Sequence, residues 1–473
     1  MQGSRTSVAD SVAPRLERTL GLRQLVLFGL AYMTPLIVLG TFGVLAADTD
    51  GAVPSAYLLA LVAMLFTAYS YGRMASAYPV AGSAYTYVRR TIGPRIGFLV
   101  GWAVLLDYLF LPMVIWLIGG AYLSAQFPDV PTWVWIVAFI GVTTVLNILG
   151  VRVAANVNAL LMTFQVLVLV LFVAFSIGYV IDHDGGGALV STAPFGNDAT
   201  TIATLAGGAA IAAYSFLGFD AVTTLTEETV DPKRTVPRAI LLITLLGGAI
   251  FVITSYTTQL VHPGGTFADP DSAAYDIART MGGSLLSSIV VAGLIVAQSA
   301  SGLAAQASGS RLMYAMGRDG VLPRRVFGYV HPRLRTPALN IAVAGAVGLI
   351  ALRSDVATST SFINFGAFTA FTFVNLAVIA FFVRHREERG PARVLGFVVA
   401  PACGAAFDIW LLTKLDGTAV TIGLIWLGVG VVLLAYLTRL FRVPPPEMRF
   451  DGAEEPTVAA SPAAEAPAPS VMA

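Results

Sequence analysis

The sequence predicts an all-α polytopic membrane protein with twelve transmembrane helices, on the strength of three observations. Hydrophobic residues make up 56% of the 473 residues and charged residues only 12%, whereas soluble domains contain about a quarter charged residues. The apolar residues form long blocks, and about 20 such residues in a helix cross a hydrocarbon core of roughly 30 Å. The basic residues gather in alternate connections between these blocks.

Apolar blocks and the polar residues between them define the spans in order. The first six spans cover approximately 23–46, 54–78, 96–125, 132–150, 155–180 and 202–226. The second six cover approximately 238–261, 282–310, 337–353, 359–383, 392–412 and 418–441. We therefore expect an N-terminal arm over 1–20, a membrane domain over 21–442 and a tail over 443–473. The tail is rich in Pro, Ala and Glu, a composition typical of disorder.

The distribution of basic residues orients these spans, because cytoplasmic connections hold an excess of Lys and Arg. With the N-terminus inside, 25 of the 28 basic residues fall on the cytoplasmic side, and the exceptions are Arg279, Arg353 and Lys414. An error of one span would invert this sorting downstream, so both termini are predicted to be cytoplasmic. The outer connections are rich in Asp, which either enriches cations near the entrance or simply solvates the loops.

Composition also argues against several classes of function. The net charge of +1, without a dense basic stretch, makes nucleic acid an unexpected partner. A single cysteine, Cys403, provides no disulfide framework. His183, His262, His331 and His385 all lie in polar connections, so we expect no metal site and no cofactor. Residues 1–20 lack the apolar core of a cleavable signal, so the first span should be retained.

Two predicted helices are interrupted at corresponding positions. The first contains Pro35 at mid-membrane depth, and the sixth contains Gly218 and Asp220 at a similar depth. These helices begin two blocks of five spans, and because five is odd the second block must insert upside down relative to the first. Paired interruptions in inverted repeats point to a substrate site at the membrane midplane. The alternative is a pair of ordinary kinks, since Gly and Pro are common in membrane helices.

Three carboxylates fall inside predicted spans: Asp107, Asp220 and Asp408. A charged group at the bilayer centre costs about 2.5–3.5 kcal/mol on insertion scales, so it usually faces a cavity or a partner. Asp408 lies outside the repeats, and we interpret it as structural or peripheral. Asp107 and Asp220 lie on helices that can face one cavity, and no lysine is predicted at that depth. This arrangement suits either protons or a cationic substrate.

Aromatic residues surround both acids. A ring face attracts an ammonium group by about 0.5–2 kcal/mol, so Tyr32, Tyr108 and Phe216 are candidate ligand contacts. The alternative for each is ordinary packing within the membrane.

Several longer motifs carry a family resemblance. They cover residues 29–35, 81–87, 105–113, 215–225, 227–229, 316–319, 326–332 and 363–367. On these motifs, residues 20–442 resemble the amino acid–polyamine–organocation transporters, and within them the bacterial putrescine importers.

The resemblance implies the leucine-transporter fold, a 5+5 inverted repeat plus two accessory helices. The repeats would cover about 23–180 and 202–383, and the accessory pair about 392–441. It also implies a secondary active transporter in the plasma (inner) membrane that imports a small cationic amine, putrescine above all, with protons by alternating access. The expected substrate contacts are Tyr32, Thr34, Asp107, Tyr108, Ser215, Phe216, Gly218 and Asp220.

Two departures from the family refine this expectation. Amino-acid members hold the substrate carboxylate on free N–H groups at the first break, but here Pro35 provides none, which favours an amine without an α-carboxylate. Some proton-coupled members carry a lysine where this chain has Gln165, which cannot titrate. Proton coupling or gating would then fall to Asp107, Asp220 or Glu228.

Glu228 lies in a mixed-charge inner loop. It could form an inner gate with Arg318 or Arg335, or lie on a solvated surface.

Alternative functions differ in class. A permease for an amino acid or a monoamine would share the fold and change the pocket. A membrane sensor or scaffold would signal through the tail, which shows no partner motif. An enzyme is not expected, because no metal cluster and no nucleophile–base motif is visible in the sequence.

Overall fold

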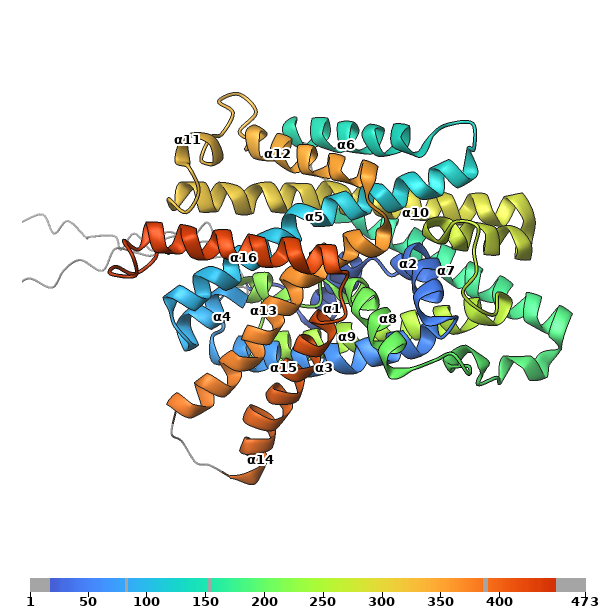
Figure 1. Cartoon of the computed structure of the whole chain (residues 1–473), viewed down its shortest axis with the longest axis horizontal. Coiled ribbons are helices and arrows are strands. Elements are labelled where there is room, and N and C mark those ends of the chain that lie inside the picture. The colour runs from blue at the N-terminus through green and yellow to red at the C-terminus, as the bar shows by residue number, and fades with distance from the viewer. Residues whose placement is uncertain (1–17, 81–83, 151–154, 386–389, 448–473) are drawn as a thin grey trace, which may run out of the picture.

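The computed structural model describes residues 18–80, 84–150, 155–385 and 390–447, with side chains from residue 160 onward in the third segment. Every regular element in these segments is a helix, apart from one isolated bridge between Leu20 and Thr229. Most long helices run side by side along the longest axis of the molecule (Figure 1). The predicted all-α fold is therefore confirmed. Residues 1–17 of the arm and 448–473 of the tail lie outside the described residues.

The first five predicted spans are occupied by helices. The first is divided into α1 (Leu22–Met33) and α2 (Ile37–Thr49), bent by 48°. Next come α3, a short helix α4, then α5, α6 and α7. Their bounds are Val53–Ala77, Ala84–Thr91, Pro94–Gln126, Thr132–Ile148 and Ala155–Asp184.

The second five spans are also helical. The sixth is divided into α8 (Ile202–Ala212), η3 (Ala213–Phe216) and η4 (Ala221–Glu228), and α9 covers Pro232–Val261. A helix α10 (Ala273–Arg318) follows, with non-helical backbone at Gly282 and Gly283. Then come α11, α12, η6 and α13. Their bounds are Arg324–Phe327, Ala338–Gly348, Leu349–Arg353 and Val356–Arg384. Short turns η1 (Gly186–Leu189), η2 (Ala193–Phe195) and η5 (Pro270–Ser272) lie in the connections.

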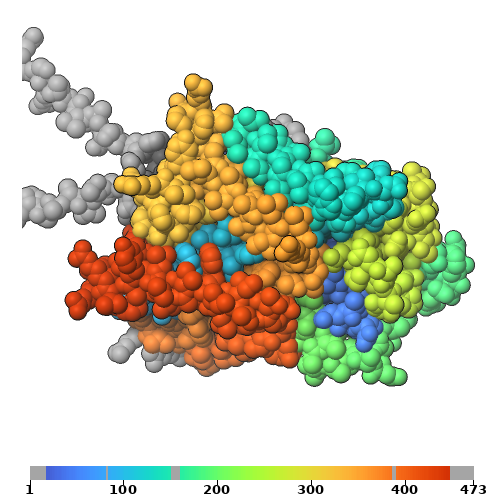
Figure 2. Space-filling model, turned by 45° about the horizontal axis from the view of Figure 1, so that its top comes forward, coloured from blue at the N-terminus to red at the C-terminus, as the bar shows by residue number. Residues whose placement is uncertain are grey.

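The accessory region contains α14 (Pro391–Val394), η7 (Leu395–Val399), α15 (Ala400–Leu412) and α16 (Gly417–Leu437). Figure 2 shows α16 lying across the outside of the molecule, next to the visible part of α5. Its apolar side chains are exposed, as Val432 and Leu424 illustrate at 70% and 59%. Such an exposed apolar face fits a helix that contacts lipid.

The length of the helices supports a multi-pass membrane protein. Nine helices of the described segments are long and apolar enough to cross a membrane, and the bent pair α1–α2 makes ten. Two further apolar helices, Thr132–Ile148 and Ala338–Arg353, occupy predicted spans but are shorter. The count of twelve spans stays a prediction.

The predicted cytoplasmic connections share one end of the molecule. Figure 1 shows α4, α11 and the end of α16 at the same end, and the connection from α7 to α8 at the opposite end. At the first end, Arg89 of α4 forms an ion pair with Glu447 at 3.1 Å. The structure describes the tail, predicted to begin at 443, as far as residue 447. This ion pair shows that the start of the tail contacts the membrane domain.

Small residues bring the helices around α5 into close contact. A Cβ on Gly309 of α10 would lie 2.7 Å from the carbonyl oxygen of Tyr108, and one on Gly366 of α13 would lie 2.7 Å from that of Ala103. Close backbone approach at glycine is a common mode of packing between membrane helices. These contacts hold the middle of α5, which carries Asp107 and Tyr108, between α10 and α13.

We predict that Gly309→Ala destabilises the protein, because the new methyl group would collide with the backbone of α5. Overpacking of this kind costs about 1–3 kcal/mol, and the midpoint of thermal unfolding in detergent should fall. Gly428→Ala is the matched control, since a Cβ there meets nothing within 4 Å. It should be neutral or slightly stabilising, because alanine is favoured over glycine in a helix by about 0.5–1 kcal/mol. Equal midpoints for the two variants would contradict this packing.

Candidate functional site

The break in the first span is a left-handed residue followed by proline. Thr34 has φ 53° and ψ 79°, and Pro35 separates it from Leu36, where α2 is capped. The carbonyl oxygen of Thr34 accepts a hydrogen bond from the N–H of Ile37 at 2.8 Å. Because proline has no N–H, this break presents fewer backbone donors than a break made of other residues.

The break in the sixth span is centred on Gly218. The backbone is extended at Leu217 (ψ 130°), and Gly218 has φ 114°, in the region that disfavours other residues. A Cβ on Gly218 would lie 2.4 Å from Cδ1 of Tyr32. The two breaks are therefore in direct contact, and the predicted pair of interruptions meets at one place.

A small hollow next to these breaks contains both repeat-region acids. It has a volume of about 50 Å³ and is lined by Asp107, Asp220, Tyr32, Tyr108 and Tyr71, among others. We call it the acid hollow. Asp107 Oδ1 is buried and has no hydrogen-bond partner among the described residues. The ion pairs within the described segments lie elsewhere, so neither acid is paired with a lysine or an arginine there.

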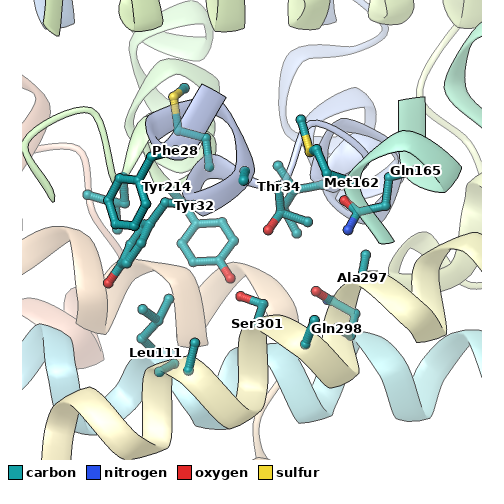
Figure 3. A pocket seen from close by; sticks show the side chains of 17 residues that line it. Phe28, Tyr32, Thr34, Leu111, Met162, Gln165, Tyr214, Ala297, Gln298 and Ser301 are labelled. Atoms are coloured by element: carbon teal, nitrogen blue, oxygen red, sulfur yellow. The ribbon is translucent and has the colours of Figure 1, made fainter. Parts of the chain in front are cut away.

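A larger hollow adjoins the first. Its volume is about 170 Å³, well above the roughly 10–15 Å³ that one water needs. Thr34 lines it from the first break, Gln165 from α7, and Gln298 and Ser301 from α10. Figure 3 shows the two glutamine amides pointing into the space from opposite walls. We call it the amide hollow.

Most of the predicted contact residues meet in these two hollows. Tyr32, Asp107, Tyr108, Gly218 and Asp220 line the acid hollow. Tyr32 also lines the amide hollow, together with Thr34 and Gln165.

Ser215 and Phe216 were also expected to contact the substrate, and the structure places them elsewhere. The hydroxyl of Ser215 is 3.1 Å from that of Tyr57 on α3. Phe216 is fully buried and packs edge-on against Phe251 of α9 at a centroid distance of 5.2 Å. Neither lines the acid hollow or the amide hollow, because η3 turns both side chains toward α3 and α9. Packing, the alternative considered for Phe216, describes both in this conformation.

Asp408 is buried and neutral groups surround it. Its Oδ2 accepts hydrogen bonds from Thr67 Oγ1 of α3 at 3.0 Å and from Asn375 Nδ2 of α13 at 2.9 Å. It is fully buried, so it is not peripheral; it joins α15 to the repeats. It lines neither hollow, and a structural role stays our interpretation.

The ion pair of Glu228 with Arg318 or Arg335, considered as an alternative to a solvated surface, is not formed in the described segments. Arg318 contacts Asp319 at 2.8 Å instead. The carbonyl oxygen of Glu228 accepts hydrogen bonds from the N–H groups of Thr19 and Leu20, at 2.9 Å each. The segment after the sixth span is thus tied to the start of the first through its backbone, and a gate through the side chain of Glu228 stays a prediction.

Sequence reasoning missed several residues that line the hollows, among them Tyr71, Gln298 and Ser301. Tyr71 of α3 lines the acid hollow, and Gln298 and Ser301 line the amide hollow. Gln298 and Ser301 are polar residues three positions apart within a predicted span, so they share one helix face. That spacing could have identified them, whereas nothing distinguishes Tyr71 from a packing tyrosine.

Comparisons with known proteins identify the family of the chain. A family model described as amino acid permease matches residues 24–423. The chain is 42% identical over 434 residues to the low-affinity putrescine importer PlaP of Escherichia coli strain K12, covering 91% of this chain and 96% of the importer. It is 26% identical over 463 residues to the methylthioribose transporter of Bacillus subtilis, covering 92% and 96%.

A vertebrate relative is considerably longer than this chain. Mouse cationic amino acid transporter 4 is 30% identical over 391 residues, which cover 78% of this chain and 60% of that transporter. The family match covers the two breaks, both acids and the glutamines of the amide hollow. With this match and a multi-pass helical fold, the chain belongs to the amino acid permease family of transport proteins.

Proposed function

We propose that this protein imports a small cationic amine, with putrescine as the leading substrate, across the plasma (inner) membrane with both termini in the cytoplasm. The observation that carries the proposal is the acid hollow. Asp107 and Asp220 line one small hollow, and no lysine or arginine of the described segments neutralises them. Uncompensated charges inside a membrane are costly, so a positively charged guest stabilises this site. The similarity to a putrescine importer supports the same substrate class.

Tyrosines around the acids add further recognition. Tyr32, Tyr71 and Tyr108 line the hollow from three different helices. Their rings offer an ammonium group cation–π attraction, and their hydroxyls can accept its N–H groups. Alternating access would then move the substrate past the contact between Tyr32 and Gly218, where the two broken helices meet.

The ion that couples to transport is a separate matter. At residue 165, where the family resemblance places a lysine in some proton-coupled members, this chain has glutamine within the amide hollow. Asp107 and Asp220 are the acids of the described site that can bind a proton and release it when the substrate binds. We propose that any proton taken up with the amine is carried by one of these two.

A competition panel tests the substrate class. Uptake of radiolabelled putrescine should be inhibited strongly by cadaverine and weakly by lysine and γ-aminobutyrate, because the carboxylate of each amino acid is repelled by two acids. Spermidine, with its greater length, reports the size of the site. Inhibition by lysine or γ-aminobutyrate as strong as that by unlabelled putrescine would favour the alternative, an amino acid permease.

A further inference from the structure

The amide hollow contains polar atoms without partners. Gln165 and Gln298 are 5% and 1% exposed. Gln165 Oε1 and Gln298 Nε2 have no hydrogen-bond partner within the described part of the chain. A buried polar group left unpaired costs about 1–3 kcal/mol, and both side chains point into the same space (Figure 3). Gln165 Oε1 is an acceptor that an ammonium group can satisfy. Gln298 Nε2 is a donor, so the Gln298 amide must rotate about its Cγ–Cδ bond to present its oxygen to the same ligand.

The lining that the two hollows share is apolar except for the hydroxyl of Tyr32. Tyr32, Leu111 and Leu217 line both spaces, so the hollows are neighbours. Leucine side chains and a tyrosine ring have no charge to offer at that point, and they suit a methylene chain. The combined site therefore has carboxylates in the acid hollow, aliphatic side chains in the shared lining, and amides and a hydroxyl in the amide hollow.

The charges of the site favour a second cation over an anion at the amide end. The acid hollow holds two carboxylates, and a single ammonium group neutralises one of them. A ligand carboxylate in the adjoining space would be repelled by the same acids, whereas a second ammonium group is attracted. Amide and hydroxyl oxygens accept the three N–H donors of an ammonium group without another charge.

We propose that the amide hollow is a second subsite, which receives the distal ammonium group of a diamine whose first ammonium group lies between Asp107 and Asp220. Gln165 and Gln298, with Ser301 beside them, then determine the preference for diamines over monoamines of the same length. This inference rests on the proposed transport of cationic amines and names the class of amine.

The test compares three four-carbon ligands that differ only at the distal end: putrescine, n-butylamine and γ-aminobutyrate. Their affinities are measured by competition against labelled putrescine and by direct uptake of labelled n-butylamine. In Gln165→Leu and in Gln298→Leu, the ratio of putrescine to n-butylamine affinity should fall about tenfold, which equals about 1.4 kcal/mol. The affinity for n-butylamine itself should stay within about twofold, since a methyl group makes no use of an amide.

Gln126→Leu is the matched control. Gln126 is a partly buried glutamine of α5 with an unpaired Oε1, but it lines neither hollow. Its replacement should leave the ratio unchanged. Should the leucine variants bind neither amine, Gln298→Glu decides the matter, because an added carboxylate at a diamine subsite should raise the putrescine preference.

Several results would overturn the inference. An unchanged ratio in both leucine variants, or an unchanged preference in Gln298→Glu, would remove the subsite. A selective loss of γ-aminobutyrate affinity would mean that the amides receive a carboxylate. Failure of the wild-type protein to transport either amine would instead contradict the proposed function itself.

Discussion

Replacing Asp220 by asparagine is expected to abolish putrescine uptake while leaving the protein in the membrane. The substitution keeps the size of the side chain and removes one of the two negative charges of the acid hollow. Loss of one partner from a buried charge pair costs about 2–5 kcal/mol, which corresponds to about 30-fold to several thousandfold in uptake at low substrate concentration. The initial rate of labelled putrescine uptake, normalised to the amount of protein in the membrane, measures the effect.

Asp408→Asn is the control for the loss of a buried acid. Asp408 accepts hydrogen bonds from Thr67 and Asn375 and lines neither hollow. An asparagine oxygen can accept the same bonds, so uptake should fall far less than in Asp220→Asn. If Asp220→Asn transports putrescine like the wild type, the acid makes no charge contact and serves gating or structure. Equal losses in both variants would show a general effect on folding.

The second large effect is that of the membrane potential on the uptake of a diamine. A diamine carries two positive charges, and the membrane potential contributes about 2.3 kcal/mol per charge per 100 mV. Two charges at about 100 mV therefore give about 4.6 kcal/mol, or more than 10³-fold accumulation at about 1.36 kcal/mol per tenfold. We predict strongly electrogenic uptake in proteoliposomes that have an inside-negative potential imposed by potassium and valinomycin.

The control separates potential from protons. A pH gradient, acidic outside, with the potential clamped at zero should drive much less accumulation if the amine enters on its own charge. A large accumulation under that condition would show proton coupling. The proton would then be carried by Asp107 or Asp220, because Gln165 cannot titrate. Uptake that ignores the imposed potential would contradict the electrogenic account.

The fold was predictable because a membrane restricts a chain to few arrangements. Every backbone polar group in lipid must be satisfied within the protein, so long apolar blocks become helices. The twelve predicted ranges accordingly hold helices, and the break at Pro35 lies where proline removes a hydrogen bond. The ends were less predictable: α10 continues to Arg318, beyond the predicted end at 310, because Met313 and Met316 are buried in the protein beyond Arg311, which interrupts the apolar run.

The site was predictable in part for a related reason. Asp107 and Asp220 stand out because acids are rare inside spans, and the structure brings them into one hollow. Tyr108 directly follows Asp107 and Phe216 lies four residues before Asp220, yet Tyr108 lines the hollow and Phe216 packs against Phe251. The direction of a side chain in an irregular turn such as η3 depends on tertiary packing, which residue neighbours alone do not give.

Equilibrium binding of labelled putrescine to the purified protein tests the central claim most directly. The wild type should bind one putrescine per chain, and Asp107→Asn combined with Asp220→Asn should bind none at the same concentrations while unfolding at a similar temperature. Binding by the double variant as tight as that by the wild type would show that the positive charge of the guest is not what the two acids recognise.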